Sequence, residues 1–72
     1  MIFNKSIGIN LDELPNILKR DYNKLLKLYD TGNEDLFSVY EEVFEASIKQ
    51  NYIDGKISKK QQELLFNIIG LY

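Results

Sequence analysis

Few side chains in this sequence could carry out chemistry. The chain has no histidine and no cysteine, which excludes the usual zinc sites, Ser–His and Cys–His nucleophile pairs and histidine acid–base catalysis. Carboxylate pairs such as Glu41 and Glu45 remain as candidates for general acid–base catalysis. On a solvated helix face, however, nothing would hold their two pKa values apart, as that role requires. The sequence therefore predicts a protein that is not an enzyme, with no catalytic residues and no cofactor.

One segment is similar to part of a calcium loop. Residues 54–58 resemble the second half of an EF-hand loop, with Gly55 at the sixth position. Extending that register places Gln50, Tyr52 and Gln61 at the first, third and twelfth positions, where the loop needs acidic or amide oxygens and finally a bidentate glutamate. We therefore interpret the segment as a turn between helices and expect no metal site.

Three lysines form a candidate nucleic-acid site. Lys56 precedes the last predicted helix, and Lys59 and Lys60 open it, where they could contact phosphates as in a helix-turn-helix protein. The net charge is −2, whereas nucleic-acid-binding proteins usually have a basic excess. The simpler interpretation is therefore solvated surface lysines, and a small dimeric DNA-binding regulator is the alternative function.

Acidic residues are concentrated in the middle of the chain. Between Asp30 and Glu45 there are six acidic residues and no basic one, and lysine-rich segments lie on either side. This block is either the solvated face of an acidic helix between two basic neighbours, or a docking surface for a basic partner. The candidate docking residues are Glu34, Asp35, Glu41, Glu42 and Glu45.

Hydrophobic periodicity predicts three helices that must position these side chains. Apolar residues recur at helical spacing over residues 13–29, 33–52 and 58–71. The connections are short, which places the first two helices in an antiparallel hairpin. A chain of 72 residues is expected to form one domain. We predict an all-α fold over residues 1–72: a small three-helix bundle, made of a helical hairpin and a third helix, with an N-terminal arm.

Local signals mark the ends of these helices. Asp12 is the predicted N-cap of the first helix, and Asn33 is that of the second. Gly32 and Gly55 can adopt the left-handed conformation that ends a helix. Ser58 begins a capping box for the third helix.

Residues 1–10 leave two possibilities open. Ile7 and Ile9 alternate about Gly8 as in a short strand, but a single strand has nothing in this chain to pair with. It would need a second copy or another protein. The alternative is an irregular arm that covers apolar surface of the helices.

The predicted helices carry more apolar surface than a small bundle can bury. In the middle helix the apolar arc spans roughly 200° at about 100° per residue, twice what a surface helix needs. The arm covers this excess, or the excess is an interface with a second copy or another protein. Candidate contact residues at the margins of the arcs or at the chain end are Val39, Leu28, Phe66, Leu71 and Tyr72.

Asp21 interrupts the apolar stripe of the first helix. On a helical wheel it falls among Leu14, Ile17 and Leu25. A carboxylate there costs free energy unless it is paired or lies at an edge. We expect an edge position, where it reaches water or a lysine of another helix. The alternative is a contact with a basic group of a partner.

Together these features predict a non-catalytic protein-binding protein: an inhibitor, immunity or accessory factor that docks on a larger partner through an acidic and apolar helical surface. A homodimer is a further option. Lys, Asn, Ile and Tyr are frequent while Ala and Arg occur once each, which is typical of AT-rich genomes and indicates a bacterial or phage source. No apolar run is long enough for a signal peptide or a membrane span, so we expect a cytoplasmic protein with no membrane partner.

Overall fold

The computed structural model describes residues 1–71 of the chain. These residues form a short 3₁₀ turn, η1 (Leu11–Glu13), and three helices, α1 (Asn16–Asp30), α2 (Glu34–Ile53) and α3 (Lys59–Ile68). The described residues contain no strand. The predicted all-α fold, a three-helix bundle, is confirmed.

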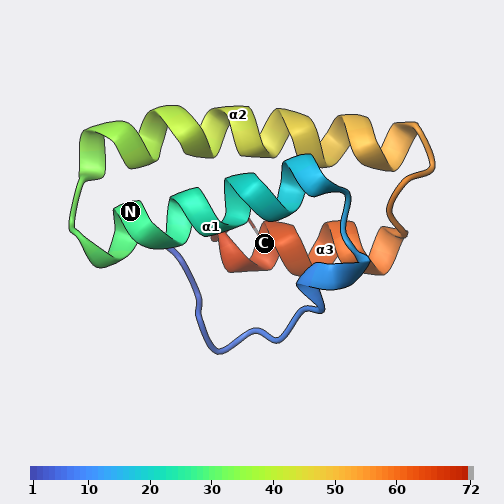
Figure 1. The fold of residues 1–72 in the computed structure, drawn as a ribbon, viewed down its shortest axis with the longest axis horizontal. Coiled ribbons are helices and arrows are strands. Elements are labelled where there is room, and N and C mark those ends of the chain that lie inside the picture. The colour runs from blue at the N-terminus through green and yellow to red at the C-terminus, as the bar shows by residue number, and fades with distance from the viewer. Residues whose placement is uncertain (72) are drawn as a thin grey trace.

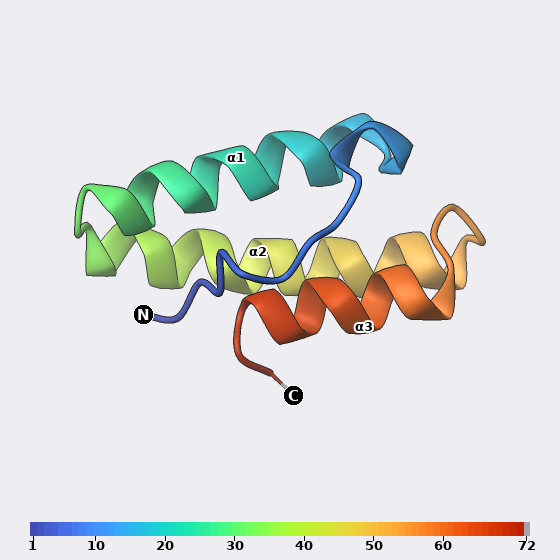
Figure 2. The same ribbon diagram turned by 90° about the horizontal axis from the view of Figure 1, so that it is seen from below.

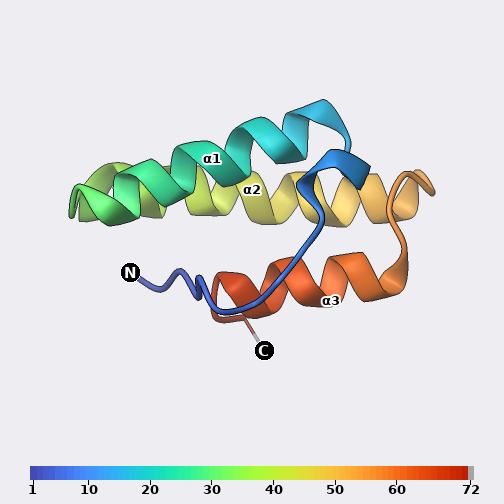
Figure 3. The same ribbon diagram turned by 60° about the horizontal axis from the view of Figure 1, so that its bottom comes forward.

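The hairpin α1–α2 forms one layer, and α3 packs against it. Helices α1 and α2 run antiparallel, and α3 then runs back along α2 (Figure 1). Most of the N-terminal arm, residues 1–10, crosses the space between α1 and α3 on the side away from α2 (Figure 2, Figure 3), while Met1 and Ile2 line a groove with residues of α2. The arm therefore acts as a lid over the open side of the bundle.

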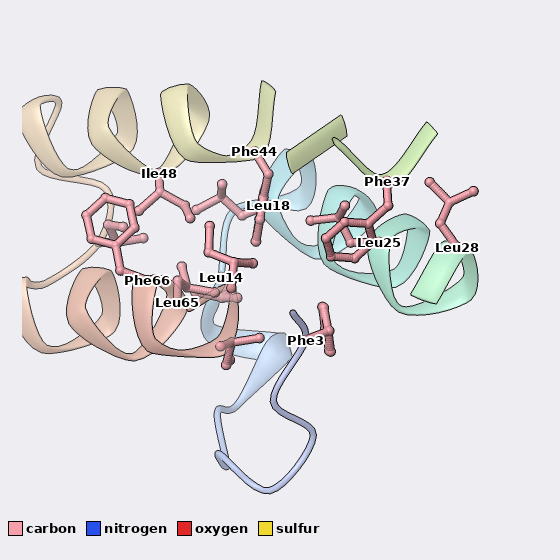
Figure 4. Close-up of a cluster of buried hydrophobic side chains, with 13 residues drawn as sticks. Phe3, Leu14, Leu18, Leu25, Leu28, Phe37, Phe44, Ile48, Leu65 and Phe66 are labelled. Carbon is pink, nitrogen blue, oxygen red and sulfur yellow. The ribbon is translucent and has the colours of Figure 1, made fainter. Parts of the chain in front are cut away.

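The core lies where the three helices and the arm meet. Figure 4 shows Phe37 and Phe44 pointing inward from α2, Leu18 pointing inward from α1, and Leu65 from α3. Burying each large apolar side chain contributes about 1.5–3 kcal/mol relative to leaving it exposed. The buried apolar residues are Phe3, Leu14, Leu18, Leu25, Leu28, Phe37, Phe44, Ile48, Ile57, Leu65, Phe66, Ile68 and Ile69.

The arm is irregular and is held by specific contacts. Phe3 is buried, with its ring edge-on to Tyr22 at 5.1 Å between centroids. The backbone N–H of Asn4 donates to the carbonyl oxygen of Ile68 at 2.7 Å, which joins the arm to α3. Of the two possibilities left open by the sequence, the structure shows the arm.

The predicted helix ends are confirmed at the two turns. Gly32 and Gly55 have φ of +71° and +74°, a conformation that residues with a Cβ rarely adopt. The side chain of Asn33 accepts a hydrogen bond from the backbone of α2. Ser58 and Gln61 form both hydrogen bonds of the capping box at the start of α3.

The start of α1 differs from the prediction, and Pro15 is the reason. The helix begins at Asn16, after Pro15, and Asp12 does not cap it. A residue before proline avoids the helical conformation, and Leu14 is accordingly extended, with ψ of 149°. Asn10 instead caps the 3₁₀ turn by accepting from the N–H of Asp12.

Candidate protein-binding face

Four large apolar side chains on α2 remain exposed, and we call them the apolar row. They are Leu36, Val39, Tyr40 and Val43, which are 45%, 58%, 37% and 51% exposed. Their spacing of i, i+3, i+4 and i+7 places them on one side of the helix. A continuous group of this kind differs from the single exposed apolar residues found on every protein, and it is typical of an interaction site.

The row is exposed because the rest of the bundle packs on another side of α2. The buried residues of this helix are Phe37, Phe44, Ile48 and Asn51. At about 100° per residue they centre roughly 100° away from the row. Most of the arm lies between α1 and α3 (Figure 2), and its first residues, Met1 and Ile2, reach α2 beside Glu41, on the side opposite the row. The arm therefore covers the core but leaves this part of the predicted apolar excess uncovered.

Basic side chains of α1 border one edge of the row. The ammonium nitrogen of Lys24 lies 5.4 Å from the centroid of the Tyr40 ring. Arg20, Asp21, Lys24 and Tyr40 together line a pocket of about 310 Å³ between α1 and α2. Lys27 continues this edge, because it follows Lys24 by three residues on the same helix and is exposed. The row thus meets a cationic edge on the α1 side.

The predicted acidic residues span an arc of about 120° on α2. Asp35 and Glu42 lie about 100° from the centre of the row, on the edge away from α1, and both are exposed. Glu34, Glu41 and Glu45 lie on the side of the helix opposite the row. The five carboxylates therefore form one broad acidic surface, one edge of which borders the row. Its use as a docking surface stays a prediction.

Glu41 lies beside the arm and the end of α3. It lines a groove of about 250 Å³ together with Met1, Ile2 and Leu71. Burial raises the pKa of its carboxyl group; the N-terminal amino group lowers it, and Glu45 and Glu42 raise it. Leu71 is 43% exposed, as expected of a contact residue. Tyr72 lies outside the described residues.

Two predicted contact residues are wrong. Leu28 and Phe66 are only 6% and 4% exposed and belong to the core. Leu28 follows Leu25 by three residues and therefore shares its inward side of α1. Phe66 is directed from α3 toward α2 (Figure 4). Neither side chain reaches the surface, so neither can contact a partner in this fold.

The expected edge position of Asp21 is also wrong. The residue is 8% exposed, because it lies on the side of α1 that faces α2. One carboxylate oxygen lies 3.6 Å from Nε of Arg20 on the same helix. The other oxygen, Oδ2, is buried and makes no hydrogen bond within the described part of the chain. The alternative reading, contact with a partner's basic group, stays a prediction, and Asp21 is in place for it at the wall of the Tyr40 pocket.

The three lysines of the alternative function are all exposed. Lys56 lies in the turn after α2, and Lys59 and Lys60 form the first two positions of α3. Lys60 lines a pocket that Ser58, Gln61 and residues of the arm also border. Their use in DNA binding stays a prediction.

Residues 1–71 contain no group of three or more acidic, histidine or cysteine side chains placed to hold a metal ion. Within the same residues, no helix is both long and apolar enough to cross a bilayer. The chain matches no known protein family, no curated protein and no solved structure. No relative indicates a functional site, so the candidate site is defined by the geometry of the apolar row and its two charged edges.

The sequence indicated Val39, Asp35 and Glu42 as contact residues, but the other residues of this face were missed. Leu36, Tyr40 and Val43 have the correct helical spacing in the sequence, and this was the available signal. Arg20 and Lys24 had no comparable signal, since their place beside Tyr40 depends on how α1 packs against α2.

Proposed function

We propose that this chain is a non-catalytic protein-binding protein, an inhibitor, immunity or accessory factor that docks on a larger partner. The observation that carries the proposal is the apolar row, four exposed side chains on one side of α2. Covering such a row removes apolar surface from water, which favours association by roughly 25 cal/mol for each Å² buried.

The charges around the row support a protein partner. Asp35 and Glu42 on one edge would attract a partner with basic side chains and would accelerate association. Glu34, Glu41 and Glu45 extend the negative surface around α2. These interactions contribute to association rate and specificity, while the apolar row provides most of the affinity.

Affinity capture from a lysate of the source cells tests the proposal. The bait is the wild-type chain, compared with Val39→Asp/Val43→Asp, which places two charges in the row. Ile53→Asp is the matched control, because Ile53 is 74% exposed on α2 and lies outside the row. We expect a specific protein that the wild type and the control retain and the double variant loses. Equal capture by all three, with circular dichroism showing intact helices, would contradict the proposal.

A further inference from the structure

The face that carries the apolar row has three parallel strips of different character. Arg20, Lys24 and Lys27 form a cationic strip along α1. The apolar row lies in the centre. Asp35 and Glu42 form an acidic strip along the far edge of α2. A partner that fits this face needs an apolar centre with an acidic strip on one edge and a basic strip on the other.

The face has the same three strips that its partner would need, so it is complementary to a second copy of itself. The direction of the two-fold axis determines which strips of the two copies come together. With a two-fold axis parallel to α2, the two α2 helices are parallel and the cationic strip of each copy faces the acidic strip of the other. With an axis perpendicular to α2 in the same plane, the helices are antiparallel and each strip faces its own kind. The first arrangement is attractive along both edges and the second is repulsive along both.

We propose that a second copy of this chain covers the apolar row, in a homodimer whose two α2 helices are parallel. The inference rests on the proposed function, because it names a partner for the same face. Lys24 lies beside Tyr40, which is two residues, or about 3 Å along α2, from Glu42. In the dimer, Lys24 of each copy lies within about 3 Å, along the axis, of the level of Glu42 in the second copy, and Lys27 lies within about 3 Å of the level of Asp35. These offsets are within the reach of lysine side chains. The apolar row meets its own counterpart along the axis.

The dimer leaves the other acidic residues of α2 accessible. Glu34, Glu41 and Glu45 lie on the side of the helix opposite the row, outside the contact between the copies. The pair would present this surface twice, and a larger basic partner could reach it. In this assembly the apolar row is used between the two copies, so a larger partner would bind through the remaining acidic surface and not through the row.

The solution mass, measured by light scattering over a wide range of concentrations, is the first test. We expect the wild type to approach twice the chain mass of 8.5 kDa and Val39→Asp/Val43→Asp to remain monomeric. A wild type that stays monomeric at every concentration would overturn the inference. The proposed function would then stand or fall by the capture experiment alone, since a foreign protein could still cover the row.

Charge exchange tests the proposed pairing. Lys24→Glu and Glu42→Lys should each weaken dimerisation by about tenfold or more, because the contact occurs twice and attraction becomes repulsion. The combined variant Lys24→Glu/Glu42→Lys should recover most of the loss. Glu45→Lys is the control, since Glu45 lies outside the contact, and should dimerise as the wild type does. Additive losses in the combined variant would overturn the pairing.

Disulfide trapping distinguishes the two orientations, because the natural chain has no cysteine. In the parallel dimer, Leu36→Cys and Val43→Cys each face their own counterpart, so each variant alone should form a disulfide-linked dimer. In an antiparallel dimer the two positions face each other. A mixture of the two variants would then cross-link strongly while each alone would not, and that result would overturn the parallel arrangement.

Discussion

At the scale of single residues, the least expected feature is a buried carboxylate in a small core. Asp21 faces α2 from the inward side of α1, and its Oδ2 makes no hydrogen bond within residues 1–71. Its neighbour Arg20 is 75% exposed at the side chain and so compensates this charge weakly. A group in this position lowers the stability of the fold, because burial removes water without supplying a full set of partners.

Asp21→Asn should therefore raise the free energy of unfolding. Removing the charge while keeping the shape relieves part of the cost of burial, and we expect a gain of about 1 kcal/mol. Urea denaturation at neutral pH measures it. Asp12→Asn is the control, because Asp12 is exposed and pairs with Lys19 at the surface; its effect should stay within about 0.5 kcal/mol. A clear loss of stability for Asp21→Asn would show that the carboxylate is needed.

Glu41 makes stability depend on pH. Because burial raises its pKa in the folded state above the ordinary value of 4.5, folding favours the protonated form. The ionised carboxylate therefore destabilises the fold at neutral pH, and this penalty disappears as the pH falls through the folded pKa and below the unfolded one. Glu41→Gln should be more stable than the wild type at neutral pH, and the advantage should vanish in acid. Denaturation at several pH values tests this, and a constant difference would contradict it.

At the scale of elements, α3 depends strongly on how it begins. It has only ten residues, and helices this short are marginal without capping and packing. Lys59 and Lys60 also place positive charge where the helix dipole disfavours it. The capping box of Ser58 and Gln61 satisfies backbone N–H groups that would otherwise lack partners.

Ser58→Ala should lower the free energy of unfolding by about 1 kcal/mol, since it removes the side chain that accepts from the N–H of Gln61. Thermal or urea unfolding measures the change. Ser38→Ala, at an exposed position within α2, controls for the loss of a hydroxyl group and should change stability by less than about 0.5 kcal/mol. Equal effects at both positions would mean that the cap is not important.

At the scale of the whole molecule, the arm completes the core of a bundle whose helices do not close on their own. It lies between α1 and α3 (Figure 3), and two adjacent residues of the arm tie it to both helices. Asn4 donates to Ile68 at the end of α3, while Lys5 forms an ion pair with Asp30 at the end of α1. Close packing is also seen at Gly70, where a Cβ would lie 2.9 Å from the side chain of Ile2.

Phe3→Ala should destabilise the molecule by about 3 kcal/mol, because it removes a buried ring and leaves a cavity between the helices. Amide exchange at Asn4 should accelerate as well, since its hydrogen bond to Ile68 depends on the docked arm. Ile53→Ala serves as the control, because Ile53 is 74% exposed. If Phe3→Ala were no more harmful than Ile53→Ala, the arm would not be part of the core.

The sequence by itself determined the number and type of the elements and most of their ends. Helical periodicity, Gly32, Gly55 and the capping box act over a few residues, so their effects can be read locally. The absence of histidine and cysteine is likewise a property of the sequence that does not depend on the fold. The start of α1 at Asn16 could also have been predicted from the sequence, since the effect of Pro15 on Leu14 is local. The prediction of Asp12 as the N-cap was wrong.

The tertiary structure alone decided which part of each apolar arc is buried. The arc of α2 contains both Phe44 and Val43, yet one is fully buried and the other is 51% exposed. Phe66 was misplaced for the same reason, whereas the three-residue spacing between Leu25 and Leu28 already indicated an inward position for Leu28. The packing angle of α1 and α3 on α2 and the path of the arm select the buried side, and these depend on contacts between residues far apart in the chain. That selection is also what places Lys24 beside Tyr40 and creates the face on which both proposals rest.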